Sequence, residues 1–250
     1  MKKVKVVFIE PPHVYLIQQQ TQAPLGLMYL SAVLEKEGYD VQIARLDTAN
    51  HKDWLKKIPE GDIYGLSAVS LDYATCKDIA LVLRAHRKNR PIIIGGYHVT
   101  ADLDTVLKND GWLWDAISVG EGEGVITTIL RDFEKNKLQK AYHGTLQPSL
   151  DTLPLPARHL IAEQGGNIFA YDKHYTQNKL STVISSSRGC PFTCSFCGTQ
   201  AMWQRKIRFR SAENIYNEIK HCIDIYGIRQ FRFSDEAFSA SWAHRVLPIN

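Results

Sequence analysis

The stretch Arg188-Gly189-Cys190-Pro191-Phe192-Thr193-Cys194-Ser195-Phe196-Cys197 decides how the rest of the chain is interpreted. Its cysteines stand four and three residues apart, so one short loop brings three thiols together. Iron-sulfur clusters are held by cysteine thiolates, normally four of them. A loop with three cysteines would leave one iron of a four-iron cluster open to a small molecule. The spacing therefore predicts a [4Fe-4S] reaction site with Cys190, Cys194 and Cys197 as its ligands.

Two other uses of these cysteines are less well supported. A structural zinc site would need a fourth Cys or His in a second knuckle, and the nearest candidates, His221 and Cys222, fall on a predicted helix. Disulfides are disfavoured because the chain has 5 cysteines, an odd number, and no secretory signal. The basic start runs into only four uninterrupted apolar residues, whereas a signal peptide needs about 7–15.

The loop resembles the C-x-x-x-C-x-aromatic-C signature of radical S-adenosylmethionine (SAM) enzymes. In that family the amino and carboxylate groups of SAM chelate the fourth iron, and an electron from the cluster cleaves SAM to a 5′-deoxyadenosyl radical. The resemblance implies that Phe196 lies near the adenine, which is compatible with simple packing of the loop by Phe192 and Phe196. It also implies that Asp235 or Glu236, after a predicted strand at 230–233, binds the SAM amino group, although two such acids also suit a polar loop.

The composition fits an ordinary globular protein. The chain has 250 residues, 44% hydrophobic and 22% charged. No apolar run approaches the 18 or so residues of a membrane span, and a net charge of +4 is too small to indicate nucleic-acid binding. We expect one or two domains, a cytoplasmic location and no membrane span.

Before the cysteine loop, short apolar runs alternate with amphipathic stretches, which is typical of a parallel sheet flanked by helices. The predicted strands are Val4–Ile9, Asp40–Ala44, Ile63–Ala68, Pro91–Ile94 and Ala116–Val119. The predicted helices are Pro24–Glu37, Asp53–Ile58, Asp72–Lys88 and Glu123–Glu134. The fold class predicted is α/β, a flavodoxin-like doubly wound parallel sheet followed by an incomplete (β/α) barrel. Ligands of such sheets bind beyond the carboxyl ends of the strands.

Small and polar residues gather where these strands end, and a flat cofactor could lie on them. A dinucleotide is disfavoured, because G-x-G-x-x-G should follow the first strand, where Glu10-Pro11-Pro12-His13 stands instead. The run Gly120-Glu121-Gly122-Glu123-Gly124 has Val125 in place of the third glycine and two carboxylates where a pyrophosphate would sit. We expect Glu123 to lie near the positive end of the helix that follows.

The same segment resembles the cobalamin-binding domain found ahead of radical SAM domains. The matching pieces are Pro11-Pro12, Pro24-Leu25-Gly26-Leu27, Gly65-Leu66-Ser67, Gly95-Gly96-Tyr97-His98-Val99-Thr100 and Gly120-Glu121-Gly122-Glu123. Their order over about 120 residues, with the cysteine loop downstream, is more specific than any one piece. The resemblance implies that nine residues approach the corrin or its nucleotide tail: Ser67, Ser70, Gly95, Gly96, His98, Thr100, Gly120, Glu121 and Glu123.

One departure concerns the cobalt ligand. Cobalamin domains of the methionine synthase type carry Asp-x-His-x-x-Gly after the first strand, and Glu10-Pro11-Pro12-His13-Val14-Tyr15 does not match it. We therefore expect cobalt without a His lower ligand, with His13 as the minor alternative because imidazole is a general metal ligand. His98 is expected to form hydrogen bonds on a Gly-rich turn.

The chain divides into three predicted segments. Residues 1–140 form the cobalamin-binding Rossmann-like domain, 141–178 a linker, and 179–250 the N-terminal part of a radical SAM barrel. The prolines of Leu150–Arg158 favour an extended connector, resembling the family's Leu-x-Pro-x-Pro linker. In the last segment Arg208 and Arg210 belong either to a solvated basic loop or, by the resemblance, lie near the cluster and offset its charge. Cys222 is expected in a helix core.

A complete barrel of eight strands needs roughly 250 residues, and 250 − 178 = 72 remain after the linker. We therefore expect a truncated gene, a fragment, or half of a split enzyme that a second chain completes. The tail Ser239–Asn250 shows no clear helical stop.

The resemblance implies a cobalamin-dependent radical SAM enzyme that transfers a methyl group to an unactivated carbon. Its cofactors would be a [4Fe-4S] cluster, SAM and cobalamin, with an electron donor such as a flavodoxin or ferredoxin and an unidentified small-molecule or peptide substrate. Relatives use the same cofactors for ring formation or oxidation. The alternatives are a non-catalytic cobalamin and iron-sulfur binding protein, and an RNA-modifying methylthiotransferase. The latter would need a second cysteine trio, and only Cys76 lies in the N-terminal segment.

Overall fold

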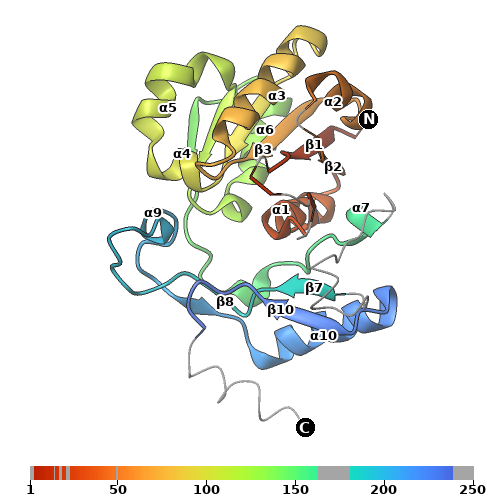
Figure 1. Cartoon of the computed structure of the whole chain (residues 1–250), viewed down its shortest axis with the longest axis vertical. Coiled ribbons are helices and arrows are strands. Elements are labelled where there is room, and N and C mark those ends of the chain that lie inside the picture. Colours follow the sequence, from red (N-terminus) through yellow and green to blue (C-terminus); the bar gives the residue numbers. More distant parts are fainter. Residues whose placement is uncertain are drawn as a thin grey trace.

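The computed structural model describes residues 3–13, 15–16, 19–20, 23–48, 50–162 and 181–238. Figure 1 shows two parts stacked on one another: an N-terminal part built on a large sheet, and a smaller C-terminal part that contains β7, β8, β10 and α10. The N-terminal part comprises β1 to β6 with their helices, and the C-terminal part comprises residues 181–238. The predicted linker from residue 163 onward and the tail Ser239–Asn250 lie outside the described residues.

The large sheet has six parallel strands in the order β2-β1-β3-β4-β5-β6. Its first five strands confirm the predicted doubly wound α/β topology. The strands are β1 (Lys5–Glu10), β2 (Asp40–Arg45), β3 (Ile63–Ser67), β4 (Ile92–Gly95), β5 (Ala116–Val119) and β6 (Ala141–His143). They are buried on both faces, so their sequences read as continuous apolar runs.

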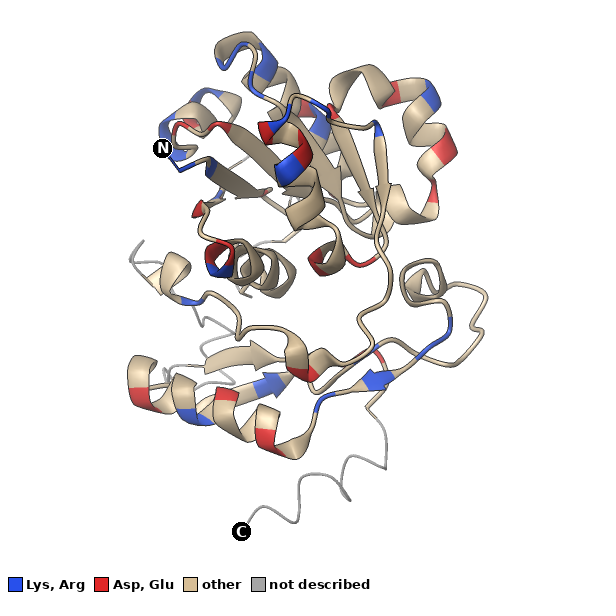
Figure 2. Cartoon of the chain, turned by 180° about the vertical axis from the view of Figure 1, so that it is seen from behind, with Lys and Arg blue, Asp and Glu red and all other residues tan. Residues whose placement is uncertain are grey.

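Helices cover both faces of this sheet, and each face has its own apolar core. On one face the helices α1 and α6 pack against Val6, Phe8 and Ile43, and on the other α2, α3, α4 and α5 pack against Val7 and Ile9. The bounds are α1 (Leu25–Lys36), α2 (His51–Lys57), α3 (Tyr73–His86), α4 (Tyr97–Ala101), α5 (Leu103–Asp110), η1 (Gly111–Leu113), η2 (Gly122–Gly124) and α6 (Ile126–Glu134). Seen from behind, the strands are mostly uncharged, while lysines, arginines, aspartates and glutamates gather on the helices and turns (Figure 2).

Two local expectations were wrong, and one strand was missed. The segment after Gly96 is not a turn, because α4 begins at Tyr97. The predicted helix Glu123–Glu134 is divided, with a 3-10 turn over Gly122–Gly124 and the α-helix starting at Ile126. Strand β6 was not expected: its three residues are too few to show a period, and only pairing with β5 defines it.

The C-terminal part contains two short sheets and one long helix. The strands β7 (Ser181–Ile184) and β10 (Gln230–Phe233) pair in parallel, and β8 (Ser187–Arg188) pairs with β9 (Arg208–Phe209) in antiparallel fashion. Its helices are α9 (Thr199–Trp203) and α10 (Ala212–Tyr226), whereas η3 (Leu150–Thr152) and α7 (His159–Ala162) lie in the segment that precedes it.

Helix α10 has the ends that its sequence predicts. The Ser211 hydroxyl caps it by accepting a hydrogen bond from the Asn214 N–H at 3.1 Å. Gly227 ends it with a φ of 65°, in the left-handed region that glycine adopts readily. Cys222 is fully buried in the stripe between these ends, as expected. None of the helices in the described ranges is long and apolar enough to cross a membrane.

Candidate functional site

The cysteine loop leaves β8 through Gly189 and ends at α9. Gly189 has a φ of +92°, and a Cβ there would lie 2.0 Å from the Lys206 carbonyl oxygen, so only glycine fits. Cys190, Cys194 and Cys197 are free thiols, and Cys194 is exposed. Sγ of Cys197 lies 3.0 Å from the Thr199 hydroxyl, and hydrogen bonds from Thr199 lower the pKa of the Cys197 thiol. The loop therefore offers accessible thiols, one of them biased toward the thiolate.

The three thiols fit an iron-sulfur cluster better than a single metal ion. Within the described residues no group of three His, Cys, Asp or Glu side chains is arranged to hold one ion. In a [4Fe-4S] cluster each thiolate binds a different iron, so the thiols need not converge on one point. Three free cysteines on one accessible loop match that requirement.

Asp235 fastens the start of the cysteine loop to the end of β10. Its Oδ1 accepts hydrogen bonds from the Ser186 hydroxyl at 2.9 Å, the Ser187 hydroxyl at 2.5 Å, and the Ser187 N–H. Its Oδ2 is buried and has no hydrogen-bond partner among the described residues. One carboxylate oxygen is thus saturated with donors while the other has none.

Glu236 connects the cysteine loop to the N-terminal part. Its Oε2 accepts a hydrogen bond from the Gly189 N–H at 3.0 Å. Its Oε1 accepts bonds from the Tyr97 hydroxyl at 3.0 Å and the Trp203 Nε1–H at 2.8 Å. Burial, with the nearby Glu236 charge, strongly raises the pKa of Tyr97. The Tyr97 hydroxyl therefore stays protonated and donates a hydrogen bond to the carboxylate.

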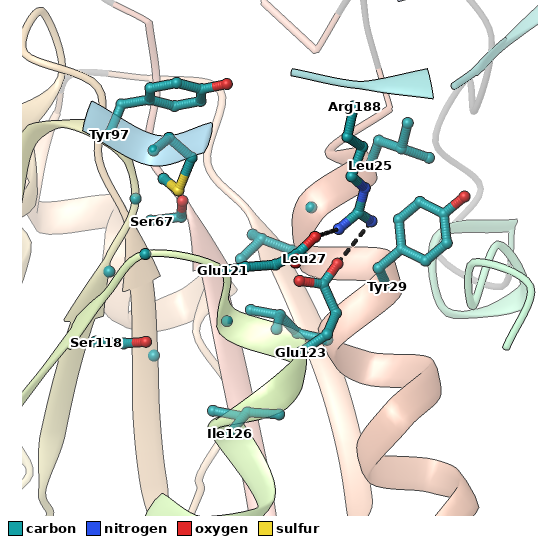
Figure 3. Close-up of a pocket in the computed structure, with 18 of the residues that line it drawn as sticks. Leu25, Leu27, Tyr29, Ser67, Tyr97, Ser118, Glu121, Glu123, Ile126 and Arg188 are labelled. Carbon is teal, nitrogen blue, oxygen red and sulfur yellow. Dashed lines mark hydrogen bonds and ion pairs between the residues drawn. The ribbon is translucent and has the colours of Figure 1, made fainter. Parts of the chain in front are cut away.

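A second connection consists of four charged side chains, which we call the interlayer charge cluster: Arg188, Arg208, Glu121 and Glu123. Arg188 Nη1 lies 2.7 Å from Glu121 Oε1, and its Nη2 lies 2.7 Å from Glu123 Oε1, as Figure 3 shows. Arg208 Nη1 lies 2.7 Å from the other Glu121 oxygen. The Glu121 side chain is fully buried, so all its charge is balanced within the protein.

Aromatic rings complete the surroundings of the interlayer charge cluster. The Arg188 guanidinium carbon lies 4.7 Å from the centre of the Tyr29 ring, and that of Arg208 lies 5.4 Å from the Trp203 ring. Both distances suit cation–π contacts. The neighbouring carboxylates raise the pKa of Arg188 further above its usual value, so its charge is permanent.

Arg210 lies elsewhere, in a separate buried group. Its Nη1 donates to the Ser185 carbonyl at 2.8 Å and pairs with Glu218, whose side chain is fully buried. Arg158 also contacts Glu218, with Nη2 2.6 Å from Oε1. Arg208 and Arg210 thus each pair with a glutamate of the protein. The expectation that they belong to a solvated basic loop was therefore wrong.

A pocket of about 270 Å³ lies between the two parts. The carboxyl ends of β3, β4 and β5 and the start of α1 line one side, and residues next to the cysteine loop line the other. Gly96 has a φ of +100°, and a Cβ there would lie 2.7 Å from the Ala68 carbonyl oxygen. The lining includes Leu25, Leu27, Tyr29, Ser67, Gly95, Gly96, Tyr97, Ser118, Gly120, Glu121, Glu123 and Ile126 from the N-terminal part, and Arg188, Met202, Trp203 and Glu236 from the C-terminal part.

The structure brings together six of the nine residues predicted to approach a corrin: Ser67, Gly95, Gly96, Gly120, Glu121 and Glu123 all line this pocket. Ser70, His98 and Thr100 do not line it. The Thr100 hydroxyl accepts a hydrogen bond from the Gly120 N–H at 2.9 Å, and His98 Nδ1 lies 3.1 Å from the Ser70 hydroxyl. His98 and Thr100 belong to α4, whose helical turn directs their side chains away from the pocket.

Several lining residues had no signal in the sequence. Tyr29 belongs to the amphipathic pattern of α1 and was indistinguishable from core, and Tyr97 stood inside a glycine-rich motif. Trp203 and Met202 followed the cysteine loop without any pattern. Phe196 is 90% exposed and is not among the residues that line this pocket.

Residues 19–130 match the family description "B12 binding domain". This part of the chain is similar to B12-binding domains. The match covers the carboxyl ends of β3, β4 and β5 and the glycine run after β5, where the pocket lies.

The likeness to known proteins extends beyond the B12-binding domain. An uncharacterized methyltransferase of Pyrococcus horikoshii is 27% identical over 96% of this chain and 55% of its own length. The anaerobic magnesium-protoporphyrin IX monomethyl ester cyclase of Synechocystis is 25% identical over 93% of this chain and 50% of its own length. The chain thus spans about half the length of these curated relatives.

Among solved structures, the radical SAM methyltransferase TsrM of Kitasatospora setae has cobalamin and a [4Fe-4S] cluster bound. It superposes with a TM-score of 0.70 at 16% identity, over 98% of this chain and 50% of its own. At that identity the likeness establishes a shared fold. The expected fold is therefore confirmed across both parts of the chain.

Proposed function

We propose that the chain is the cobalamin- and cluster-binding part of a cobalamin-dependent radical SAM enzyme, whose reaction is methyl transfer to an unactivated carbon. One observation carries the proposal: a loop with three free cysteines is tied through Arg188 and Glu236 to the carboxyl edge of a B12-binding sheet. When bound, the cluster would supply the electron that cleaves SAM, and cobalamin would supply the methyl group.

The cysteine loop would hold the cluster with Cys190, Cys194 and Cys197. Thr199 favours the thiolate of Cys197, which is the form that binds iron. The hydrogen bond from the Gly189 N–H to Glu236 fixes the residue before Cys190. The protein therefore contributes both ligands and a braced loop end.

Of the two acids, Asp235 has the better-supported role in binding SAM. Its buried Oδ2 has no partner among the described residues, and a bound ammonium group would satisfy it. Glu236 already accepts three hydrogen bonds, so it has fewer acceptor sites left for an ammonium group. Phe196 keeps its proposed place near the adenine because its exposed ring is free to cover a ligand.

The corrin would lie across the pocket between the two parts. Gly95, Gly96 and Gly120 allow close approach of backbone, and a Cβ at Gly26 would meet nothing within 4 Å. The pocket volume is near the lower end of the roughly 300–1,000 Å³ typical of small-molecule sites, so a corrin would cover the mouth of the pocket. Ser70, His98 and Thr100 remain predictions that no contact with this pocket supports.

The remaining proposals are coarser. We keep the predicted division at 1–140, 141–178 and 179–250, a cytoplasmic location where thiols stay reduced, and a flavodoxin or ferredoxin as electron donor. The cyclase among the relatives supports ring formation as a second candidate reaction. An RNA-directed methylthiotransferase is not supported, because the N-terminal segment holds a single cysteine, Cys76, which is buried.

The test is anaerobic reconstitution of the full chain with iron, sulfide and hydroxocobalamin. We expect about four irons per chain, retained corrinoid, and release of 5′-deoxyadenosine from SAM after reduction. Retention of both cofactors without 5′-deoxyadenosine would favour a binding protein without turnover. Zinc in place of iron, or loss of all corrinoid on desalting, would contradict the proposal.

A further inference from the structure

The first residue of α9, Thr199, touches one thiol of the cysteine loop with two groups. Its hydroxyl lies 3.0 Å from Sγ of Cys197, and its backbone N–H also forms a hydrogen bond with that sulfur. A thiolate carries no proton to donate, so Thr199 is the donor in both contacts once Cys197 is ionised. In the described part of the chain no hydrogen bond reaches Sγ of Cys190 or Cys194. One of the three thiols is therefore distinguished from the other two.

Hydrogen bonds on both sides of Thr199 fix its position against the loop. The Cys194 carbonyl accepts a bond from the Cys197 N–H at 3.1 Å and another from the Gln200 side chain at 3.3 Å. The oxygen of the Gln200 side chain accepts a bond from Arg205 Nε at 3.1 Å. The turn that leads from the second cysteine into α9 is thus closed by contacts that flank Thr199. This arrangement holds the threonine hydroxyl at the sulfur.

The charge nearest to this sulfur works against added negative charge. Thr199 lowers the pKa of the Cys197 thiol, whereas the Glu236 carboxylate acts in the opposite direction. The arginines of the interlayer charge cluster are already paired with carboxylates. Repulsion from a carboxylate makes it harder to add an electron to a cluster. A hydrogen-bond donor to a cluster sulfur has the opposite effect, because it stabilises the added charge.

We propose that the Thr199 hydroxyl donates a hydrogen bond to the Cys197 sulfur of the bound cluster and raises the reduction potential of that cluster. Reduction adds one electron from the donor protein, which is oxidised in turn, and leaves more negative charge on the sulfurs. The hydrogen bond is therefore stronger in the reduced state than in the oxidised state. Thr199 acts through Cys197, so it is a positioning residue and not a ligand. This inference rests on the proposed function, since it assumes that the cysteine loop binds a [4Fe-4S] cluster.

The experiment is a redox titration of the full chain after anaerobic reconstitution with iron and sulfide, without SAM or cobalamin. Dithionite and mediator dyes set the potential, and electron paramagnetic resonance measures the reduced cluster. Thr199→Val removes the hydroxyl but keeps the backbone N–H and the size of the side chain. We expect its midpoint potential to be more negative than that of the parent protein. Thr199→Ser keeps a hydroxyl and should return the midpoint toward the parent value.

Thr193→Val is the matched control. Thr193 is exposed on the same loop, and no hydrogen bond within the described ranges joins it to a cysteine sulfur. This variant should keep the midpoint potential of the parent protein. The iron content of each variant is measured as well, so that a change of potential is compared only between proteins with equal cluster loading.

A second measurement detects the hydrogen bond itself. Resonance Raman spectra of the oxidised cluster record the stretching bands of the bonds between iron and cysteine sulfur. Exchange into D₂O should shift these bands in the parent protein and in Thr199→Ser. The shift should be smaller in Thr199→Val, where only the backbone N–H remains as a donor. Equal shifts in all three proteins would contradict a bond from the hydroxyl.

The outcomes separate this inference from the proposed function. An unchanged or more positive midpoint in Thr199→Val, or an equal shift in Thr193→Val, overturns the role of Thr199 while cluster binding stands. A shift in Thr199→Ser as large as that in Thr199→Val overturns it as well. If Thr199→Val binds no iron, Thr199→Ala supplies the midpoint; if neither binds iron, the hydroxyl serves assembly and the inference fails. A parent chain that binds no iron overturns both.

Discussion

Cys194 and Cys222 carry the same thiol in opposite surroundings. Cys194 is exposed on its loop, whereas Cys222 is a fully buried residue of α10. Burial raises the pKa of Cys222 to about 11, so it stays a neutral thiol. The difference in accessibility therefore suits Cys194 to metal binding and Cys222 to packing in the core.

Cys194→Ser should abolish cluster assembly, since a serine hydroxyl does not replace a thiolate on iron. The measurement is iron and sulfide content, with the visible absorption of the reconstituted protein. Cys222→Ala is the control, expected to keep its iron while the free energy of unfolding falls by about 1–2 kcal/mol. Equal iron content in the two variants would contradict the assignment of the cluster ligands.

His98 is expected to make the free energy of unfolding depend on pH. Burial lowers the pKa of His98 below its ordinary value of about 6.5. The unfolded chain therefore takes up this proton more readily, so stability is complete above pH of about 6.5 and is lost as pH falls toward the lower folded pKa. His98→Gln should flatten the dependence of the urea midpoint on pH below about 6.5. An unchanged slope would assign the acid sensitivity to other groups.

The cysteine loop depends on one of its two glycines. Gly189, at φ +92° and against the Lys206 carbonyl, tolerates no Cβ, whereas a Cβ at Gly198 would meet nothing within 4 Å. Gly189→Ala should therefore displace the loop and lower iron content after reconstitution, while Gly198→Ala should match the parent protein. Near-ultraviolet circular dichroism of the apoproteins checks that the rest of each variant folds. The prediction fails if both variants load iron equally.

The elements that the sequence predicted are those whose pattern repeats within themselves. Helix α10 was predictable from Ser211, its apolar stripe and Gly227, and the first five strands from their apolar runs. Strand β6 was not, because three residues carry no period and its pairing partner lies elsewhere in the chain. Likewise, α4 lies inside a glycine motif that resembles a turn.

The interlayer charge cluster binds the two parts of the molecule to each other. Arg188→Met should leave Glu121 and Glu123 with too little positive charge in a buried site, which typically costs about 3–5 kcal/mol. Arg131→Met is the control, because Arg131 and Glu37 form an exposed pair, at 57% and 40% exposure, worth below about 1 kcal/mol. Urea unfolding of the two variants measures the difference. Similar losses would show that the buried pairs contribute no more than a surface pair.

The candidate site could be predicted only in part, because several of its residues are far apart in the sequence. The sequence identified the three cysteines, because a metal-binding loop gathers its ligands within a few residues. It placed Glu121 and Glu123 at the edge of the sheet that lines the pocket, but it did not indicate the arginine that binds them. The arginine that binds them is 67 residues away from Glu121, and no local pattern links the two positions. Buried ion pairs between distant segments emerge only from the folded chain.

Glu236 touches the cysteine loop, α9 and α4 at once. A ligand that binds Oε1 of Glu236 would therefore compete with Tyr97 and Trp203 for that oxygen. By thermodynamic reciprocity, whatever fastens Tyr97 more tightly would weaken that ligand to the same degree. A ligand bound at Tyr97 in the N-terminal part would thus change the affinity of the Glu236 carboxylate for a ligand in the C-terminal part.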